Sequence, residues 1–211
     1  MGVIKRGILG GFSGSVANVV GSSWKGIAVI KSKPLSVANP KTAGQVNQRT
    51  KFSACSLFAR NILASVVKPL WDRFAQRMSG YNAFIKENID NFNTSGVAIL
   101  PQLVFSVGSL TASEDFEVAC SNGSTDAYCS WTDNSGTGTA LATDDVYLVI
   151  IDAVTDEVMV SAADVTRDAD HTTITMDTAA VTGESVYGYI SFRSADGYKV
   201  STSDTYHEVV P

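Results

Sequence analysis

No acidic residue precedes Asp72 in this 211-residue chain. Residues 1–95 carry thirteen lysines and arginines against three acids, whereas residues 96–211 carry three against eighteen. The net charge of −5 is therefore the sum of two parts of opposite sign. Because a surface of one sign attracts partners of the other, we expect the first half to face something negative.

Cysteine and long apolar runs are also scarce. The three cysteines, Cys55, Cys120 and Cys129, lack CxxC spacing and nearby histidines, which excludes a zinc site or a disulfide framework. We expect reduced thiols in the core, with a Cys120–Cys129 disulfide across a hairpin as the alternative. No apolar run approaches the roughly 20 residues of a membrane span. The N-terminus lacks the apolar stretch of a secretory signal, so we expect synthesis in a reducing cytoplasm and no membrane partner.

The chain divides into three segments, of which the first, residues 1–40, is rich in glycine and serine. Short β-type runs separated by glycines predict three strands with two turns between them. The strands are expected at 3–9, 15–20 and 24–31, and the turns at Gly10-Gly11 and Gly21-Ser22-Ser23. Hairpins of this size bury little apolar surface, so the segment needs a partner, either the rest of the chain or another subunit.

Residues 41–93 change to a helical pattern. Thr42 with Gln45 forms a capping-box pattern at the start of a first helix, which Lys68-Pro69 should end. A second helix is expected to begin near Pro69 and to break at Ser79-Gly80, after which the pattern resumes as far as Ile89. The apolar stripe of the first helix comprises Phe52, Cys55, Phe58, Ile62, Leu63 and Val66. The segment therefore predicts an antiparallel helical hairpin.

Residues 102–211 predict an all-β domain. About seven short strands at roughly 12-residue spacing are typical of an antiparallel sandwich of immunoglobulin or fibronectin type. Residues 146–151 are apolar throughout, as in a strand buried on both faces, and Asp196-Gly197 predicts a hairpin turn. We expect an α+β chain with a basic hairpin and helical domain at 1–95 and an acidic sandwich at 96–211.

Two acidic clusters are the candidates for chemistry. Asp144-Asp145, after the loop at 133–138, could bind calcium, although its spacing matches no EF-hand and a solvated loop is the other interpretation. Asp164, Asp168, Asp170 and His171 could hold a metal or supply an acid/base pair, or form an ordinary loop. A nucleophile elbow and the lysine spacing of a P-loop are both missing. The sequence therefore predicts no enzyme, no cofactor, no metal and no small-molecule substrate.

The basic half offers candidate anion-facing residues. Interleaved with Trp24 and Trp71, they could bind single-stranded nucleic acid by stacking, although no RNP, KH or helix-turn-helix signature accompanies them. Alternatively they meet the acidic half of another copy, in contacts that build rings or filaments. The residues are Lys5, Arg6, Lys25, Lys31, Lys33, Lys41, Arg49 and Lys51.

Several motifs give the chain a resemblance. A glycine-rich hairpin ends in W-x-G, and a P-x-T-x-x-Q-x-x-x-R-x-x-F pattern follows at Pro40, Thr42, Gln45, Arg49 and Phe52. Trp71, Ala75, the SGYNAF run at 79–84 and Asn88 complete the set, and the SWTDNS run at 130–135 with Asp144 is also similar. With these motifs the chain resembles an uncharacterised domain-of-unknown-function family of Bacteroidota and their phages. Ala17-Asn18 departs from it, since glycine is common there.

The resemblance to phage-type proteins implies a virion component by association. Together with the charge division, it leads us to expect a non-enzymatic structural protein, capsid- or tail-associated, whose partners are its own copies and other structural proteins. The alternatives are a nucleic-acid-binding protein and a surface module in which the sandwich binds glycans or a host. For a glycan, the sandwich offers Trp131 and a few tyrosines.

Overall fold

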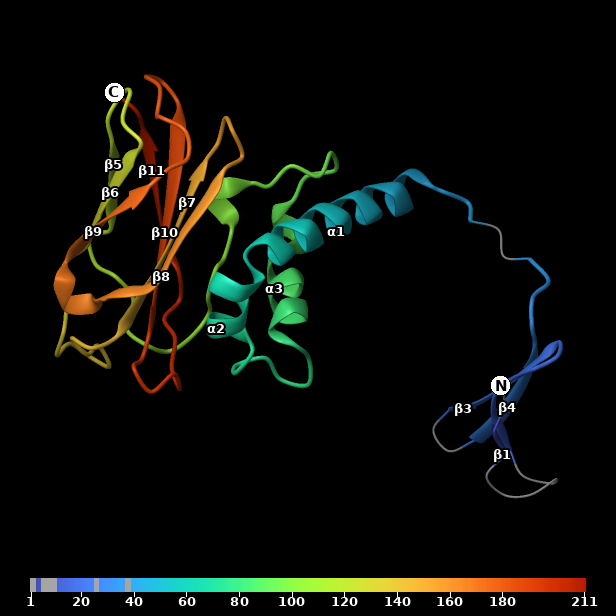
Figure 1. Ribbon diagram of the computed structural model, residues 1–211. Helices are drawn as coiled ribbons and strands as arrows, with labels where there is room; N and C mark the ends of the chain where they lie inside the picture. Colours follow the sequence, from blue (N-terminus) through green and yellow to red (C-terminus); the bar gives the residue numbers. More distant parts are fainter. Residues whose placement is uncertain (1–2, 5–10, 25–26, 37–38) are drawn as a thin grey trace. The chain divides into compact units, whose positions relative to one another are not determined.

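The computed structural model describes residues 3–4, 11–24, 27–36 and 39–211 (Figure 1). The chain forms two compact units, Met1–Thr42 and Ala43–Pro211. The first unit is a four-stranded antiparallel sheet in the order β1-β2-β3-β4. Its strands are β1 (Val3–Ile4), β2 (Phe12–Val16), β3 (Val19–Trp24) and β4 (Ile27–Ser32).

The turns of this sheet differ from the expected ones. The chain turns at Ala17-Asn18, because Val16 pairs with Val19 and Ala17 adopts the left-handed φ of 48°. Gly21 to Ser23, expected as a turn, lie inside β3, so that prediction is wrong. Gly21 serves another purpose: a Cβ there would lie 2.6 Å from the Phe12 ring, which packs across it. The expected turn at Gly10-Gly11 includes Gly10, which lies outside the described residues.

The second unit begins with helices. The first expected helix ends early, because α1 stops at Asn61 and a π-helical turn (Leu63–Val67) leads directly into α2. Lys68 is helical at φ −63°, ψ −52°, so the prediction that Lys68-Pro69 interrupts the helical backbone is wrong. The prediction that a second helix begins near Pro69 is confirmed, because Pro69 lies in the first turn of α2. Pro69 cannot donate a hydrogen bond and would crowd the carbonyl four residues before it, and the wider turn relieves both problems. The helices are α1 (Ala43–Asn61), α2 (Lys68–Trp71) and α3 (Gly80–Asn88).

The segment after α2 also departs from the prediction. Instead of continuing to Met78, the helix ends at Trp71, and residues 72–79 form turns. Ser79 caps α3 by accepting a hydrogen bond from the Asn82 backbone N–H at 3.3 Å. Short 3₁₀ helices follow at Ile89–Asn91, Leu100–Gln102 and Arg167–Ala169.

Seven antiparallel strands form the predicted sandwich. One sheet has the order β11-β10-β7-β8 and the other β5-β6-β9. The turn at Asp196-Gly197 lies where it was predicted, with Gly197 at a φ of 69°, and Arg193 pairs with Val200 across it. The strands are β5 (Glu117–Cys120), β6 (Asp126–Ser130), β7 (Asp145–Asp152), β8 (Val158–Thr166), β9 (His171–Thr175), β10 (Ser185–Arg193) and β11 (Asp204–Val209).

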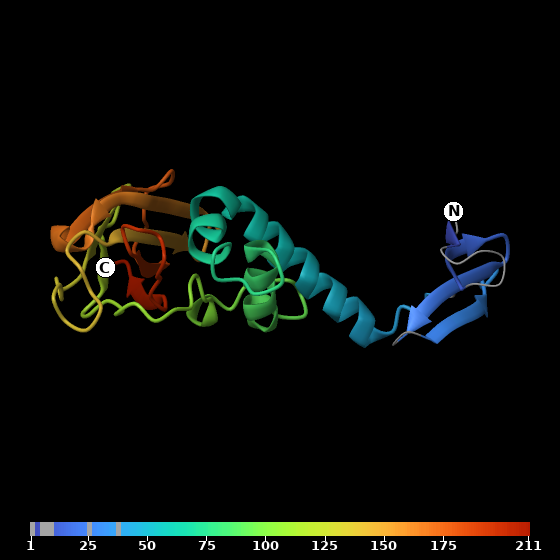
Figure 2. The same ribbon diagram turned by 90° about the horizontal axis from the view of Figure 1, so that it is seen from below.

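The four-stranded sheet of the sandwich, β11-β10-β7-β8, is covered on both faces. Val146, Leu148 and Ile150 of β7 point into the core between the sheets, where β5, β6 and β9 contribute residues such as Cys129. Tyr147, Val149 and Ile151 point the other way, into a second core that they share with the helices. Figures 1 and 2 show the helices beside this sheet. The prediction that residues 146–151 are buried on both faces is therefore confirmed.

The second core also explains where the compact units divide. Phe84 of α3 and Tyr189 of β10 both pack on Phe105, with ring centroids 6.2 Å and 4.5 Å away. The Trp71 indole donates a hydrogen bond to the Phe105 carbonyl at 2.7 Å. The helices thus belong to one compact unit with the sandwich, and the division falls between Thr42 and Ala43 instead of near residue 95.

Candidate assembly surfaces

The N-terminal sheet leaves its side chains exposed or half-buried. Of its residues with described side chains, Gly21 alone is buried. β-branched residues on both faces are exposed by a third or more, and Leu35, just after the sheet, is 97% exposed. A sheet of this kind lacks a core of its own and requires a covering surface. The exposed β-branched residues are Val16, Val19, Ile27, Val29 and Ile30.

The first compact unit carries charge of one sign only, while the second carries the other ten cations together with all of the acids. Residues 1–42 contain six basic residues and no acid, and every acid of the protein lies in residues 43–211. Lys31, Lys33 and Lys41 are exposed. Lys5, Arg6 and Lys25 lie outside the described residues. Arg49 and Lys51 belong to α1, so the predicted anion-facing set is divided between the two units.

The sandwich, residues 96–211, neutralises few of its own carboxylates. Of the three cations in residues 96–211, Arg167 pairs with Asp144 at 3.2 Å and Arg193 with Asp145 at 2.7 Å. Lys199 is the third and is exposed. The surface of the sandwich is therefore strongly negative, because most of its other acids lie at exposed positions.

Arg167 and Asp144 form a buried cross-link. Both side chains are fully buried, and the guanidinium lies 3.6 Å from the centroid of the Phe192 ring. It also donates to Asn134 Oδ1 at 2.6 Å and to the Thr111 carbonyl at 2.9 Å. Burial lowers the pKa of Arg167 and Asp144 opposes that shift, while an arginine stays charged in any case. Through this network Arg167 joins the three loops that contain Thr111, Asn134 and Asp144.

The network argues against the calcium site considered for Asp144-Asp145. Asp144 Oδ2 accepts hydrogen bonds from Arg167 and the Leu141 backbone, so it is a structural partner and not a loop ligand open to solvent. No group of three or more histidine, cysteine, aspartate or glutamate side chains is arranged to hold a metal in the part of the chain that the structure describes. Sequence reasoning singled out Asp144 and missed Arg167, although a rare arginine in an acidic segment was the available signal.

The second acidic cluster is a set of local loop contacts. Asp164 accepts a hydrogen bond from Ser161 at 2.9 Å, and Asp168 accepts one from Thr166 at 2.6 Å. Asp170 contacts His171, whose ring lies 5.6 Å from that of Tyr128 on the outer face of the three-stranded sheet. These side chains serve different neighbours and do not converge on one point.

The cysteines are inert core residues. All three are free and buried. Burial raises the pKa of Cys129 to about 12, and it is the main cause that raises the pKa of Cys55 and Cys120 to about 11. Because the thiolate is the reactive form, these groups stay protonated and unreactive near neutral pH. The prediction of reduced core thiols is confirmed for Cys120 and Cys129.

Two of the tryptophans are buried in the core. Trp71 is 7% exposed and Trp131 is 4% exposed. The Trp131 indole donates to the Arg167 carbonyl at 2.8 Å. Neither ring is available to stack on a base or a sugar, so neither can carry the alternative functions considered for it.

Residues of the SGYNAF run at 79–84 and the nearby Asn88 make structural contacts. Gly80 approaches Asp72 so closely that a Cβ would lie 2.6 Å from the Asp72 backbone nitrogen. Four residues beyond the motif, the buried Asn88 amide donates to the Val104 carbonyl and accepts from its N–H, both at 2.8 Å. Phe52, in contrast, is 52% exposed, so its predicted place in the buried helix stripe is wrong.

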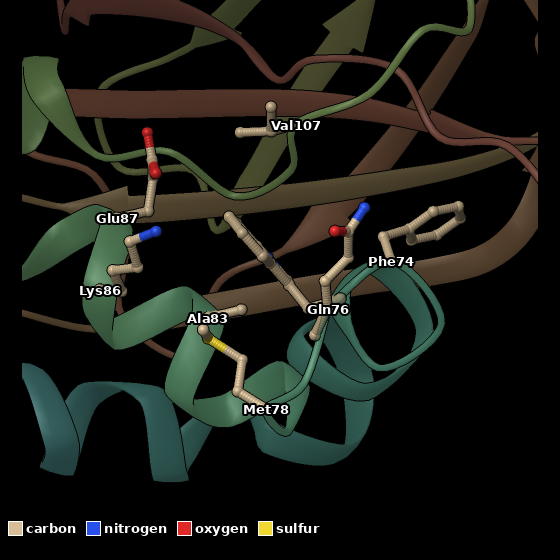
Figure 3. A pocket seen from close by; sticks show the side chains of 9 residues that line it. Phe74, Gln76, Met78, Ala83, Lys86, Glu87 and Val107 are labelled. Atoms are coloured by element: carbon tan, nitrogen blue, oxygen red, sulfur yellow. The ribbon is translucent and has the colours of Figure 1, made fainter. Parts of the chain in front are cut away.

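Two of the hollows on the surface of the helices combine apolar and charged residues. The first, about 350 Å³, lies between α3 and residues 72–79, with Val107 across from Met78 (Figure 3). Lys86 and Glu87 stand exposed at its rim, and no buried polar group converges on it to orient a ligand. The second, about 260 Å³, lies between α1 and residues 92–100 and has Asp156 among its lining residues. Leu57 and Val97 line it and are more than half exposed.

These features define a chain with a basic, coreless sheet and an acidic helix-covered sandwich. The chain belongs to a family of unknown function, DUF6266, which it matches over residues 11–206. The expected membership of an uncharacterised family is thereby confirmed. No match was found among curated proteins. Among solved structures, one titled "Myokine structure" is 10% identical and covers 49% of this chain and 99% of its own, with a TM-score of 0.35. None of the described helices is long and apolar enough to cross a membrane.

Proposed function

We propose that this protein is a non-enzymatic structural component that assembles by docking its basic N-terminal unit on the acidic unit of another copy. One observation carries the proposal: six basic residues and no acid lie in the first compact unit, while all twenty-one acids lie in the second. Contacts between two different surfaces of one chain are heterologous, and they produce rings or filaments.

The exposed apolar side chains of the sheet support the same proposal. Ile27 is 62% exposed and Ile30 66% exposed, so docking would remove substantial apolar surface from water in addition to pairing charges. On the acidic unit, the hollow lined by Leu57, Val97 and Asp156 combines apolar contact with a carboxylate. A surface of that kind suits an apolar sheet that carries lysines.

We also propose that this assembly belongs to a virion. The resemblance of residues 40–52 and 79–88 to phage-type proteins supports a virion, with the protein in the capsid or the tail. Other structural proteins of the particle would then be further partners. The proposal includes no cofactor, no small-molecule substrate and no membrane.

Nucleic acid is the second candidate partner, because a unit with no acid attracts any polyanion. Binding should then weaken steeply with salt, in proportion to the number of phosphates contacted. The burial of Trp71 removes one of the two tryptophans proposed to stack on bases. Titration of the full chain with a single-stranded and a double-stranded oligonucleotide at about 50 mM salt separates the candidates. Binding that dissolves the assembly would favour nucleic acid.

Charge reversal in the full chain tests the docking. We expect Lys31→Glu with Lys33→Glu to abolish the docking contact, and with it the larger assembly at about 50 mM salt, because the docking surface then repels the acidic unit. Lys199→Glu is the matched control, since it adds a negative charge at an exposed position of the acidic unit itself. Light scattering measures both variants. If the double variant assembles like the wild type, the docking proposal is wrong.

A further inference from the structure

Strand β4 has an open edge. It comes last in the sheet order β1-β2-β3-β4, and all six of its residues are exposed. One edge pairs with β3, from Val19↔Ser32 to Trp24↔Ile27. No described strand pairs with the other edge.

The ladder shows which backbone groups face outward. The Lys33 N–H donates to the Asn18 carbonyl at 2.7 Å, which extends the bonding between β3 and β4 by one residue pair. Since bonded and non-bonded pairs alternate in an antiparallel ladder, Val29 and Lys31 also bond to β3. The N–H and C=O groups of Ala28, Ile30 and Ser32 therefore point away from the sheet.

This edge carries only part of the usual protection against pairing. Proteins shield open edges with charged residues such as lysine, and with proline, bulges or short strands. Here Lys31 is the one charged residue of β4, Pro34 follows the strand, and the six-residue strand also contains Ile27, Val29 and Ile30. Unpaired backbone groups along an extended strand fit one kind of partner, another extended strand.

We propose that β4 pairs antiparallel with β4 of a second copy, with Ile30 opposite Ile30 at the two-fold axis. This register joins all three outward-facing residues, Ala28 with Ser32, Ile30 with Ile30 and Ser32 with Ala28. The pairing is a contact between copies beyond the charge-driven docking, and together they would connect the two sheets and the acidic units into an extended assembly.

The register accommodates a second copy as the occupant of this edge. Lys31 lies opposite Val29 of the other copy, so its aliphatic stem covers an apolar side chain and no lysine directly opposes another. The two units still repel one another, because both are basic. Salt screens that repulsion, with a Debye length of about 10 Å at 0.1 M. Pairing therefore strengthens as salt rises, opposite to the docking contact.

Cysteine cross-linking in the full chain tests the register. We expect Ile30→Cys to form a disulfide-linked dimer under mild oxidation, since directly bonded antiparallel partners have Cα atoms about 5.5 Å apart. Leu35→Cys is the matched control: it is more exposed but lies outside the strand. The native cysteines are buried and contribute little background. Equal cross-linking rates for the two variants would overturn the register.

A proline variant tests the pairing itself. The Ile30 N–H is not used within the sheet, so Ile30→Pro should keep the sheet and block the second strand, whereas Ile30→Val should preserve both. At about 500 mM salt, where docking is screened, sedimentation should show a dimer for the wild type and Ile30→Val and a monomer for Ile30→Pro. A dimeric Ile30→Pro, or a monomeric wild type, contradicts the pairing. If the wild type forms a larger species at low salt and a monomer at high salt, only the docking proposal stands. If it is a dimer at every salt concentration, only the β4 pairing stands.

Discussion

Single residues of the motifs noted in the sequence are mostly structural. Asp144 joins Arg167 in a fully buried ion pair, Asn88 holds Val104 by two hydrogen bonds, and Gly80 permits a close approach to Asp72. None of these side chains is presented to solvent in a way that a substrate could use. Two groups of residues face solvent: the exposed lysines and β-branched side chains of the first unit, and the exposed acids of the sandwich.

Removal of Arg167 should be the most costly single change to the sandwich. Arg167→Ala leaves the Asp144 carboxylate buried without its cation, so we expect a loss of about 3–5 kcal/mol in the free energy of unfolding. Arg193→Ala removes a partly exposed pair and should cost about 1 kcal/mol or less. Urea unfolding of both variants checks this. A similar loss for the two would show that burial of the first pair does not govern its contribution.

At the residue scale, the sequence indicated notable side chains but not their partners. Asp144-Asp145 and the loop at 133–138 were interpreted as possible calcium ligands because their residue types are visible in the sequence. The partner of Asp144, Arg167, lies twenty-three positions further on. Pairings at that separation depend on how β7 and β8 place the following loop, and residue types alone do not specify it. The burial of Trp71 was predictable, because it lies in a helical apolar pattern.

At the scale of elements, periodicity located the β7 strand and the helices better than it located their ends. An unbroken apolar run at 146–151 requires two covering layers, and it has them. The turn at Gly21 was predicted from glycine and serine as turn residues, yet the Phe12 ring requires a glycine inside the strand. Proline at 69 suggested a helix end, and a π-helical turn accommodated it instead.

A glycine in β10 shows how closely the two sheets of the sandwich approach. A Cβ at Gly188 would overlap the side chain of Val118 and lie 3.2 Å from the Phe116 ring. We expect Gly188→Ala to destabilise the protein by about 1–3 kcal/mol through overpacking. Gly44→Ala is the control, because nothing lies within 4 Å of its Cβ position in α1, and it should stabilise the helix by about 0.5–1 kcal/mol. Thermal unfolding measures both; a neutral Gly188→Ala would contradict the packing described here.

At the scale of the whole molecule, charge and compactness agree with each other. The sequence predicted two parts of opposite charge, and the compact units place the boundary at Thr42 because the helices share a core with the sandwich. That shared core joins Trp71 and Phe84 to Tyr189, more than a hundred residues away, so composition near residue 95 could not show it. The result is a wholly basic first unit and a second unit in which ten cations accompany all twenty-one acids.

The dependence of assembly size on salt tests the proposed assembly most directly. Sedimentation of the full chain at about 50 mM and about 500 mM salt should show species larger than a dimer at low salt, held by docking of the basic unit on acidic units. These should fall to the dimer at high salt, where the docking is screened and the β4 pairing is not. One unchanged size at both salt concentrations, whether monomer or dimer, would contradict assembly through charge.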